Sequence, residues 1–350
     1  PLSNGAILAD EVGLGKTIEA GLIISQKWAE NKRKILIIVP SSIRSQWQAE
    51  LSEKFYLPSV IIESKYFNEK IKKGSANPFK QHIIVIASYH FVRNKAEFIK
   101  DIKWDLAVID EAHRLRNVYK KTNKIARTIK NTLKNVPKIL LTATPLHNSL
   151  LELYGLVSFI DEYTFGDLNS FKYNFTKLDE NNDKWGDLKS RLNLVCKRTL
   201  RRQVNEYIKY TNRIPLIQEF TPTRNEMILY DWVSDYLRKK DLYALPSGQR
   251  ALMTLVMRKL LASSSFAIGG TLTKLINRLE MKMKTPQLRF DFSDIEEDFE
   301  HLHEVNDEWD EGNSEHDTSN YSRFKPDEKI DPYILQKEID ELKTCRDLAL

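Results

Sequence analysis

Short apolar runs alternate with longer mixed segments along the first 160 positions of the chain. Six of these runs are rich in β-branched residues: "AILA", "ILIIVP", "SVII", "IIVIAS", "LAVID" and "KILLTAT". Nearly continuous apolar strands separated by helix-forming stretches are typical of a parallel sheet covered on both faces. We therefore predict an α/β fold with a doubly wound, mainly parallel sheet, in which functional side chains follow the C-terminal ends of the strands.

The strand pattern disappears after about residue 160. Segments such as "DKWGDLKSRLNLVCKRTLRRQ", "NEMILYDWVSDYLRKK" and "DPYILQKEIDELKTCRDLAL" have apolar residues at intervals of three and four, which is the period of a helix. The predicted organisation is a first lobe over 1–160, a mostly helical extension over 161–290, an acidic, mobile linker or insertion over 291–325 and a further helix over 326–350.

Charge is unevenly distributed along the chain. The formal net charge is +6, yet residues 291–317 hold thirteen Asp or Glu and no Lys or Arg, whereas residues 114–138 hold nine Lys or Arg and no acid. The basic run fits a polyanion partner, and a solvated helix face is the other interpretation. The acidic stretch is either a mobile surface segment or a mimic of DNA that covers the basic surface.

Composition argues against several classes of protein. No apolar run approaches the roughly 18 residues of a membrane span, and the first residues, "PLSNG", lack the features of a signal peptide. Cys196 and Cys345 are the only cysteines; they are too few for a disulfide framework and favour a reducing, cytosolic compartment. Because the chain does not begin with Met and a strand starts almost at once, we expect a piece of a longer protein.

The stretch "ILADEVGLGKTIEAGL", residues 7–22, resembles a phosphate-binding loop, although Asp10 stands where the pattern G-x-x-x-x-G-K-[ST] begins with glycine. The glycines permit backbone angles that turn successive N–H groups toward an anion, and the following helix adds its N-terminal dipole. Lys16 would reach the β- and γ-phosphates of ATP, and the Thr17 hydroxyl would bind Mg²⁺. The expected nucleotide-binding residues are Gly13, Leu14, Gly15, Lys16, Thr17, Ile18 and Asp110.

A second motif, "LAVIDEAHRLRN", places Asp110 and Glu111 at the end of a hydrophobic strand. Asp110 would hold Mg²⁺ through water, and Glu111 would orient and activate the water that attacks the γ-phosphate. An exposed Asp-Glu pair is common by itself. In a chain that also carries GKT, its place after an apolar strand predicts ATP hydrolysis, with Lys16 and Glu111 as catalytic residues.

These motifs resemble those of superfamily-two helicases. "DEAHRLRN" and "LTATPLHNSLLELYGLVSFI" narrow the similarity to the Swi/Snf-type branch of double-stranded DNA translocases, including bacterial members related to the RNA-polymerase-recycling translocase. That branch reads D-E-x-G-L-G-K-T in its nucleotide loop, which accounts for Asp10. The resemblance implies a RecA-like P-loop lobe that uses ATP and Mg²⁺, and it implies that Thr142 and Thr144 link His113 to the DNA side and couple hydrolysis to movement.

The resemblance also supplies candidate DNA contacts. The segments "VPSSIRSQWQAEL", "IASYHFVR" and "CKRTLRRQV" are similar to family motifs that lie along the nucleic-acid backbone or lead to an arginine pair. Two interpretations of that pair stay open, because Val204 replaces the lysine usual in the family. The arginines contact DNA or a second lobe, or they lie on a solvated helical face. The candidates are Pro40, Ser41, Ser42, Ser88, Tyr89, Asn148, Arg201 and Arg202.

The family's second RecA-like lobe carries a G-x-G-L-N switch and a Q-x-x-G-R-x-x-R stretch with an arginine finger, and neither occurs in this sequence. We therefore expect the ATP-binding first lobe of a double-stranded DNA translocase, poorly active alone. A strand-separating DNA or RNA helicase and a non-hydrolysing, nucleotide-dependent interaction module are the alternatives. The implied partners are double-stranded DNA and RNA polymerase or another nucleoprotein complex, in a bacterial or phage-type cytosol near the nucleoid and without a membrane.

Overall fold

The computed structural model of the chain describes residues 4–146, 149–176, 184–204, 206–207, 214–217, 219, 221–239, 242–244, 254, 257–258, 260–261, 264–284 and 331–350. These residues form two compact units. The described residues up to 207 make up the first unit, and those from 214 onward make up the second.

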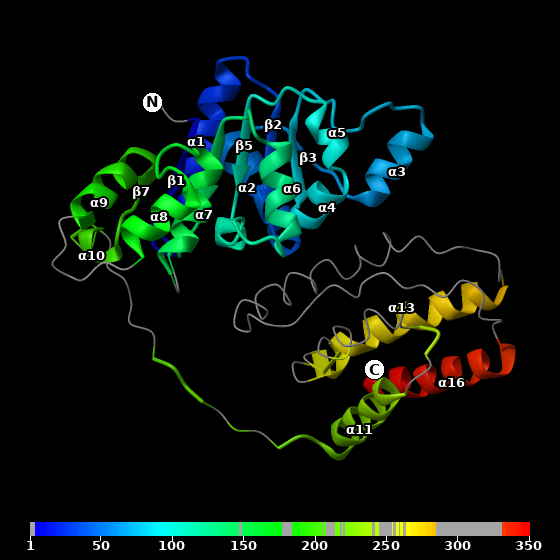
Figure 1. The fold of residues 1–350 in the computed structure, drawn as a ribbon. Helices are drawn as coiled ribbons and strands as arrows, with labels where there is room; N and C mark the ends of the chain where they lie inside the picture. The colour runs from blue at the N-terminus through cyan, green and yellow to red at the C-terminus, as the bar shows by residue number, and fades with distance from the viewer. Residues whose placement is uncertain are drawn as a thin grey trace. The chain divides into compact units, whose positions relative to one another are not determined.

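The first unit is built on a seven-stranded sheet with the order β3-β4-β2-β5-β6-β1-β7 (Figure 1). Every neighbouring pair of strands is parallel. Six strands coincide with the six apolar runs of the sequence, which confirms the predicted α/β, doubly wound, parallel sheet. The strands are β1 (Gly5–Leu8), β2 (Ile35–Val39), β3 (Ser59–Ile61), β4 (Ile84–Ser88), β5 (Leu106–Ile109), β6 (Lys138–Leu141) and β7 (Cys196–Lys197).

Helices connect these strands. Two short 3₁₀ turns, η1 (Ser41–Ile43) and η2 (Ala112–Leu115), follow β2 and β5. The α-helices of this unit are α1 (Lys16–Ala29), α2 (Arg44–Phe55), α3 (Ser64–Lys72), α4 (Tyr89–Asn94), α5 (Ala96–Lys100), α6 (Lys124–Thr132), α7 (Leu150–Ile160), α8 (Leu168–Phe175), α9 (Lys184–Val195) and α10 (Arg201–Val204).

Alternate residues of each central strand face opposite sides of the sheet, as the pleat requires. In β2, Ile35, Ile37 and Val39 pack with α1 and α2. Leu36 and Ile38 belong to the cluster on the other face, to which the helices from α3 to α9 contribute. Both faces are covered, so the central strands are buried along their whole length and read as continuous apolar runs.

The first unit extends past residue 160, where the sequence predicted a boundary. Helices α7, α8 and α9 pack on the same hydrophobic cluster as the sheet. Residues 196–197, predicted as helix, form β7 instead, and Cys196 pairs with Ile7 at the outer edge of β1. The open edge of β1 favours pairing over one more helical turn, and this long-range contact overrides the local helical pattern.

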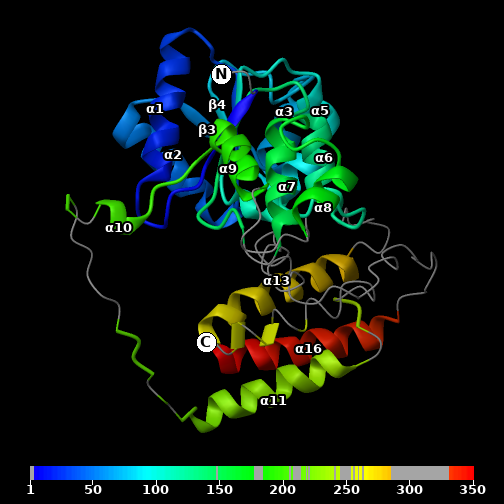
Figure 2. The same ribbon diagram turned by 60° about the vertical axis from the view of Figure 1, so that its left-hand side comes forward.

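The second unit contains three long helices, α11 (Arg224–Arg238), α13 (Ser265–Lys284) and α16 (Pro332–Ala349). Figure 2 shows α16 beside both α11 and α13. Buried residues on α16, such as Leu335, Ile339 and Leu342, recur at helical spacing. The acidic stretch 291–325 lies outside the described residues. Within the described part of the chain, no helix has the length and apolarity needed to cross a membrane.

Candidate active site

The loop between β1 and α1 has the backbone of an anion cradle. Gly13 and Gly15 adopt φ angles of 83° and 86°, which glycine reaches without the steric cost of a side chain. Lys16 begins α1, and its Nζ donates to the carbonyl oxygens of Asp10 at 2.9 Å and Glu11 at 3.4 Å. The loop therefore brings an ammonium group to backbone N–H groups at a helix N-terminus, as phosphate binding requires.

Asp10 has a structural role that explains its place in the loop. Its side chain is buried, and Oδ1 accepts a 2.6 Å hydrogen bond from the backbone N–H of Thr199. Glu11 makes a similar bond, because its Oε2 accepts from the backbone N–H of Arg201 at 2.5 Å. The two carboxylates thus fasten the loop to the segment that follows β7. They do so about 190 positions further along the chain.

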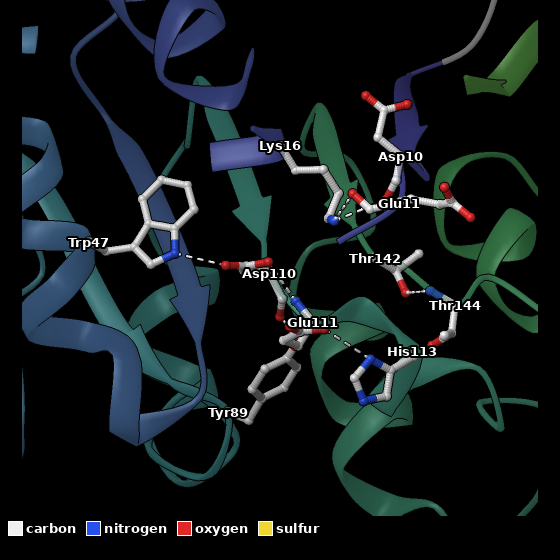
Figure 3. Close-up of polar contacts among 10 residues, drawn as sticks. All are labelled: Asp10, Glu11, Lys16, Trp47, Tyr89, Asp110, Glu111, His113, Thr142 and Thr144. Carbon is white, nitrogen blue, oxygen red and sulfur yellow. Dashed lines mark hydrogen bonds and ion pairs between the residues drawn. The ribbon is translucent and has the colours of Figure 1, made fainter. Parts of the chain in front are cut away.

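Asp110 lies at the C-terminal end of β5 and is held by three neighbours (Figure 3). Its Oδ2 accepts from the indole N–H of Trp47 at 2.8 Å, and its Oδ1 accepts from the backbone N–H of Glu111 at 2.8 Å. The Tyr89 hydroxyl donates to its backbone carbonyl. Burial raises the pKa of the Asp110 carboxyl, and the indole N–H opposes that rise.

Glu111 has a strained backbone, with φ 50° and ψ 45° in the left-handed region. Its Oε2 lies 3.1 Å from Nδ1 of His113, and this neighbour lowers the pKa of the Glu111 carboxyl. The pKa values of the two adjacent carboxyls are therefore shifted in opposite directions. The lowered pKa favours the ionised form of the Glu111 carboxyl.

Thr142 and Thr144 follow β6 at the same edge of the sheet (Figure 3). Thr142 is buried, and its backbone N–H donates to the Leu8 carbonyl at the end of β1. Its Oγ1 accepts from the backbone N–H of Thr144 at 3.2 Å. Thr142 therefore lies beside the strand that leads into the phosphate loop, while the predicted link from His113 to the DNA side stays a prediction.

The candidate DNA contacts have unequal access to solvent. Ser88 and Tyr89 are buried, with relative exposures of 0% and 2%, and their contact with DNA stays a prediction. The Ser88 hydroxyl caps α4 by accepting from the Phe91 N–H, and Tyr89 supports Asp110. Pro40 is also buried, Ser41 is half-buried, and Ser42 and Arg202 are exposed. Asn148 lies outside the described residues.

The basic run 114–138 is partly used by the fold. Arg116 Nε lies 3.7 Å from Oε1 of the buried Glu152, and Lys130 Nζ lies 2.8 Å from Oε1 of Glu162. Lys138 is 2% exposed and donates to the Val136 carbonyl, and burial lowers its pKa to about 8. The basic residues that remain exposed are Lys120, Lys121, Lys124, Arg127 and Lys134.

Helix α7 packs closely against the segment after Asp110. A Cβ added at Gly155 would lie 1.8 Å from the Arg116 carbonyl oxygen, so only glycine permits this approach. Glu152 on the same helix pairs with Arg116. Helix α7 therefore holds the segment that follows Asp110 and Glu111 in place through its contacts with Arg116.

The donor groups at this edge suit Mg²⁺ better than a transition metal. Asp110 and the Thr17 hydroxyl offer oxygen atoms, which Mg²⁺ prefers, with substrate phosphates and water completing its shell. Among the described residues, no cluster of three or more His, Cys, Asp or Glu could hold a metal by itself.

Two contacts at the site were missed by sequence reasoning. Trp47 is not among the site residues predicted from the sequence, yet its indole N–H donates to Asp110. Arg201 was expected at DNA, at a second lobe or on a solvated face, yet its guanidinium lies on the phosphate loop. Neither contact has a local signal, because the partners are 63 and 189 positions apart in the sequence.

A family model described as the SNF2-related domain matches residues 2–278. The Bacillus subtilis (strain 168) protein named "Uncharacterized ATP-dependent helicase YqhH" is 35% identical over 284 residues, which cover 80% of this chain and 47% of that protein. The RNA polymerase-associated protein RapA of Serratia proteamaculans (strain 568) is 36% identical over 170 residues, covering 47% of this chain and 18% of that protein. The chain thus matches less than half the length of these relatives.

Among solved structures, the Sulfolobus solfataricus SWI2/SNF2 ATPase core in complex with dsDNA is similar to this chain. The two are 23% identical with a TM-score of 0.48, and the match covers 73% of this chain and 53% of that one. The ATPase core domain of the same organism gives 23% identity and a TM-score of 0.46.

Proposed function

The chain belongs to the SNF2-related domain family of ATP-dependent, helicase-like ATPases, and from that premise we propose that it is the nucleotide-binding lobe of a double-stranded DNA translocase. The observation that carries the proposal is the meeting, at one edge of the sheet, of the Lys16 loop with Asp110 and Glu111 (Figure 3). The charge of Lys16 acts on both carboxyls: burial raises the pKa of Asp110 and Lys16 opposes that rise, whereas His113 lowers the pKa of Glu111 and Lys16 adds to that effect.

Each residue has a role in hydrolysis that follows from its chemistry. The Lys16 ammonium neutralises phosphate charge, and the loop N–H groups bind phosphate oxygens. Glu111, ionised beside His113, orients a water and accepts its proton. Asp110 and Thr17 would hold Mg²⁺, which supplies positive charge to the phosphates when bound.

Double-stranded DNA is proposed as the polymer substrate because the chain carries the family's motifs at the same sheet edge. Ser42 and Arg202 are the exposed ones among the predicted contacts that the structure describes. RNA polymerase or another nucleoprotein complex is a further proposed partner, because RapA is named as RNA polymerase-associated. With DNA as the substrate, the location we propose is the cytosol near the nucleoid, in a bacterial or phage-type system.

The isolated chain should hydrolyse ATP poorly. In phosphoryl-transfer enzymes an arginine finger accelerates turnover by roughly 10³ to 10⁵, and the motif that carries it in this family does not occur in this sequence. A second lobe would have to supply that charge.

The decisive experiment measures steady-state ATP hydrolysis by a protein extended to include the second lobe. The conditions are no nucleic acid, duplex DNA, single-stranded DNA and RNA, with the 350-residue chain in parallel. Glu111→Gln is the matched control, since it keeps the size of the side chain and removes the base, and we expect it to lose roughly 10² to 10⁴ in rate.

Stimulation by duplex DNA alone, lost in Glu111→Gln and nearly absent in the 350-residue chain, would support the proposal. Equal stimulation by single strands or RNA would replace it with the strand-separating helicase. Absence of turnover under every condition would leave a nucleotide-dependent interaction module.

A further inference from the structure

Residues 197–201, which we call the loop strap, run along the phosphate loop. The Ala9 N–H donates to the Lys197 carbonyl at 2.7 Å, and the Glu11 N–H donates to the Thr199 carbonyl at 3.1 Å. In the opposite direction, the carboxylates of Asp10 and Glu11 accept hydrogen bonds from backbone N–H groups of the strap. The first half of the loop is therefore paired on one side almost as a strand would be.

The last residue of the strap adds a side-chain contact. Nε and Nη2 of Arg201 both donate to the Val12 carbonyl oxygen, at 3.0 and 2.6 Å. A Cβ added at Gly13 would lie 3.5 Å from the same Nη2 atom. The guanidinium thus lies against the peptide that joins Val12 to Gly13, at the point where the chain enters its left-handed turn.

We propose that Arg201 is a positioning residue for nucleotide binding, which acts by fixing the Val12 carbonyl. The inference rests on the ATP site assigned above. A phosphate loop binds anions because its N–H dipoles point inward, so a carbonyl oxygen that turned inward would repel the phosphates. By donating two hydrogen bonds to the Val12 oxygen, Arg201 keeps that carbonyl outside the cradle before phosphate binds.

Arginine suits this position better than lysine. Its planar fork donates two N–H groups to one acceptor in a fixed geometry, and its charge strengthens both bonds. The Val12 side chain is 59% exposed, so packing of that side chain does little to hold the peptide. The carboxylates of Asp10 and Glu11 fix the preceding residues, and Arg201 completes the restraint at Val12.

The test compares Arg201→Ala and Arg201→Lys with Arg198→Ala in the 350-residue chain. Arg198 is an exposed arginine of the same strap, so replacing it by alanine changes the net charge by the same amount and leaves the contact with Val12 in place. Affinities for Mg·ADP and for inorganic tripolyphosphate are measured by calorimetry. Tripolyphosphate has no adenosine, so it reports the loop alone.

We expect Arg201→Ala to weaken both ligands by the same factor, roughly tenfold, as the loss of charge-assisted hydrogen bonds implies. Arg201→Lys should recover part of the loss, and Arg198→Ala should stay within about twofold of the wild-type value. Circular dichroism at the assay temperature checks that every variant is folded.

Unchanged affinity of Arg201→Ala would overturn the proposal, as would a loss confined to Mg·ADP. If the wild-type chain binds both ligands, such a result leaves the ATP site intact and refutes only the role of Arg201. Failure of the wild-type chain to bind either ligand would refute the site itself and this inference with it.

Discussion

The indole N–H of Trp47 donates a 2.8 Å hydrogen bond to Oδ2 of Asp110, across 63 positions of sequence. Trp47 belongs to α2 and Asp110 to the end of β5, so the bond joins a helix on one face of the sheet to the functional edge. One carboxylate oxygen is oriented by the indole and the other by the Glu111 N–H. The direction in which Asp110 presents its charge is thus fixed by the fold.

Trp47→Phe should therefore weaken Mg²⁺-dependent nucleotide binding. By analogy with groups that orient metal ligands, the apparent Mg²⁺ affinity should fall by roughly tenfold or more. Fluorescent ADP binding titrated against Mg²⁺ measures it. Trp104→Phe is the matched control, because Trp104 is equally buried and donates its indole N–H to the Ile99 carbonyl, away from the site. Equal Mg²⁺ dependence in the two variants would contradict the role of Trp47.

Gly155→Ala should destabilise the lobe by about 3 kcal/mol, since the new methyl group would collide with the Arg116 carbonyl. Gly186→Ala provides the opposite control in another helix. An added Cβ at Gly186 meets no atom within 4 Å, so this change should stabilise by about 0.5–1 kcal/mol. Urea unfolding of both variants measures the two shifts. An unchanged free energy of unfolding in Gly155→Ala would show that α7 can move away from Arg116.

The second unit should depend on Glu338. Its buried carboxylate accepts from the Tyr236 hydroxyl and from the N–H groups of Tyr243 and Ala244. Glu338→Ala would leave these donors unpaired at a cost of about 3 kcal/mol or more. Hydrogen exchange of α11 and α16 should then accelerate. Glu341→Ala removes an exposed ion pair with Lys239 and should cost less than about 1 kcal/mol; equal effects would argue against a special role for Glu338.

Lys138 should make stability depend on pH above neutrality. Burial lowers its pKa from 10.5 to about 8, so between pH 8 and 10.5 the unfolded chain binds more protons than the folded one. The contribution of Lys138 to stability therefore rises with pH through that window. The free energy of unfolding of Lys138→Met, relative to that of wild type, should therefore be highest at pH 7 and fall progressively toward pH 10.

The difference in free energy of unfolding between Lys138→Met and wild type, measured in urea at several pH values, tests this slope. Lys134→Met is the control, because Lys134 is exposed on the same segment and should give a difference that changes little with pH. A flat profile for Lys138→Met would show that the ammonium is solvated.

The strands and the two chemical motifs could be predicted from the sequence because their signals are local. A strand such as β2 is buried on both faces and must be apolar throughout, and Gly13 and Gly15 identify a turn that needs left-handed backbone angles. The ends of parallel strands meet at one edge, so Lys16 and Asp110 could be placed together without coordinates.

What the sequence did not reveal depends on contacts between distant segments. The two residues of β7 lie in a helical pattern, and only the open edge of β1 makes them a strand. The basic run looked uniform, yet Glu152 and Glu162 from a later segment pair with Arg116 and Lys130. Burial of Tyr89 likewise follows from packing, which a motif does not encode.

The attachment of the phosphate loop to residues 197–201 has a consequence for synthesis on the ribosome. The hydrogen-bond partners of the loop are made about 190 residues after the loop itself. At roughly 5–20 residues per second, this delay is about 10 to 40 s. Until then the outer edge of β1 has no strand to pair with, and the nascent lobe carries an unfinished nucleotide site. The phosphate loop is therefore made well before the contacts that complete it.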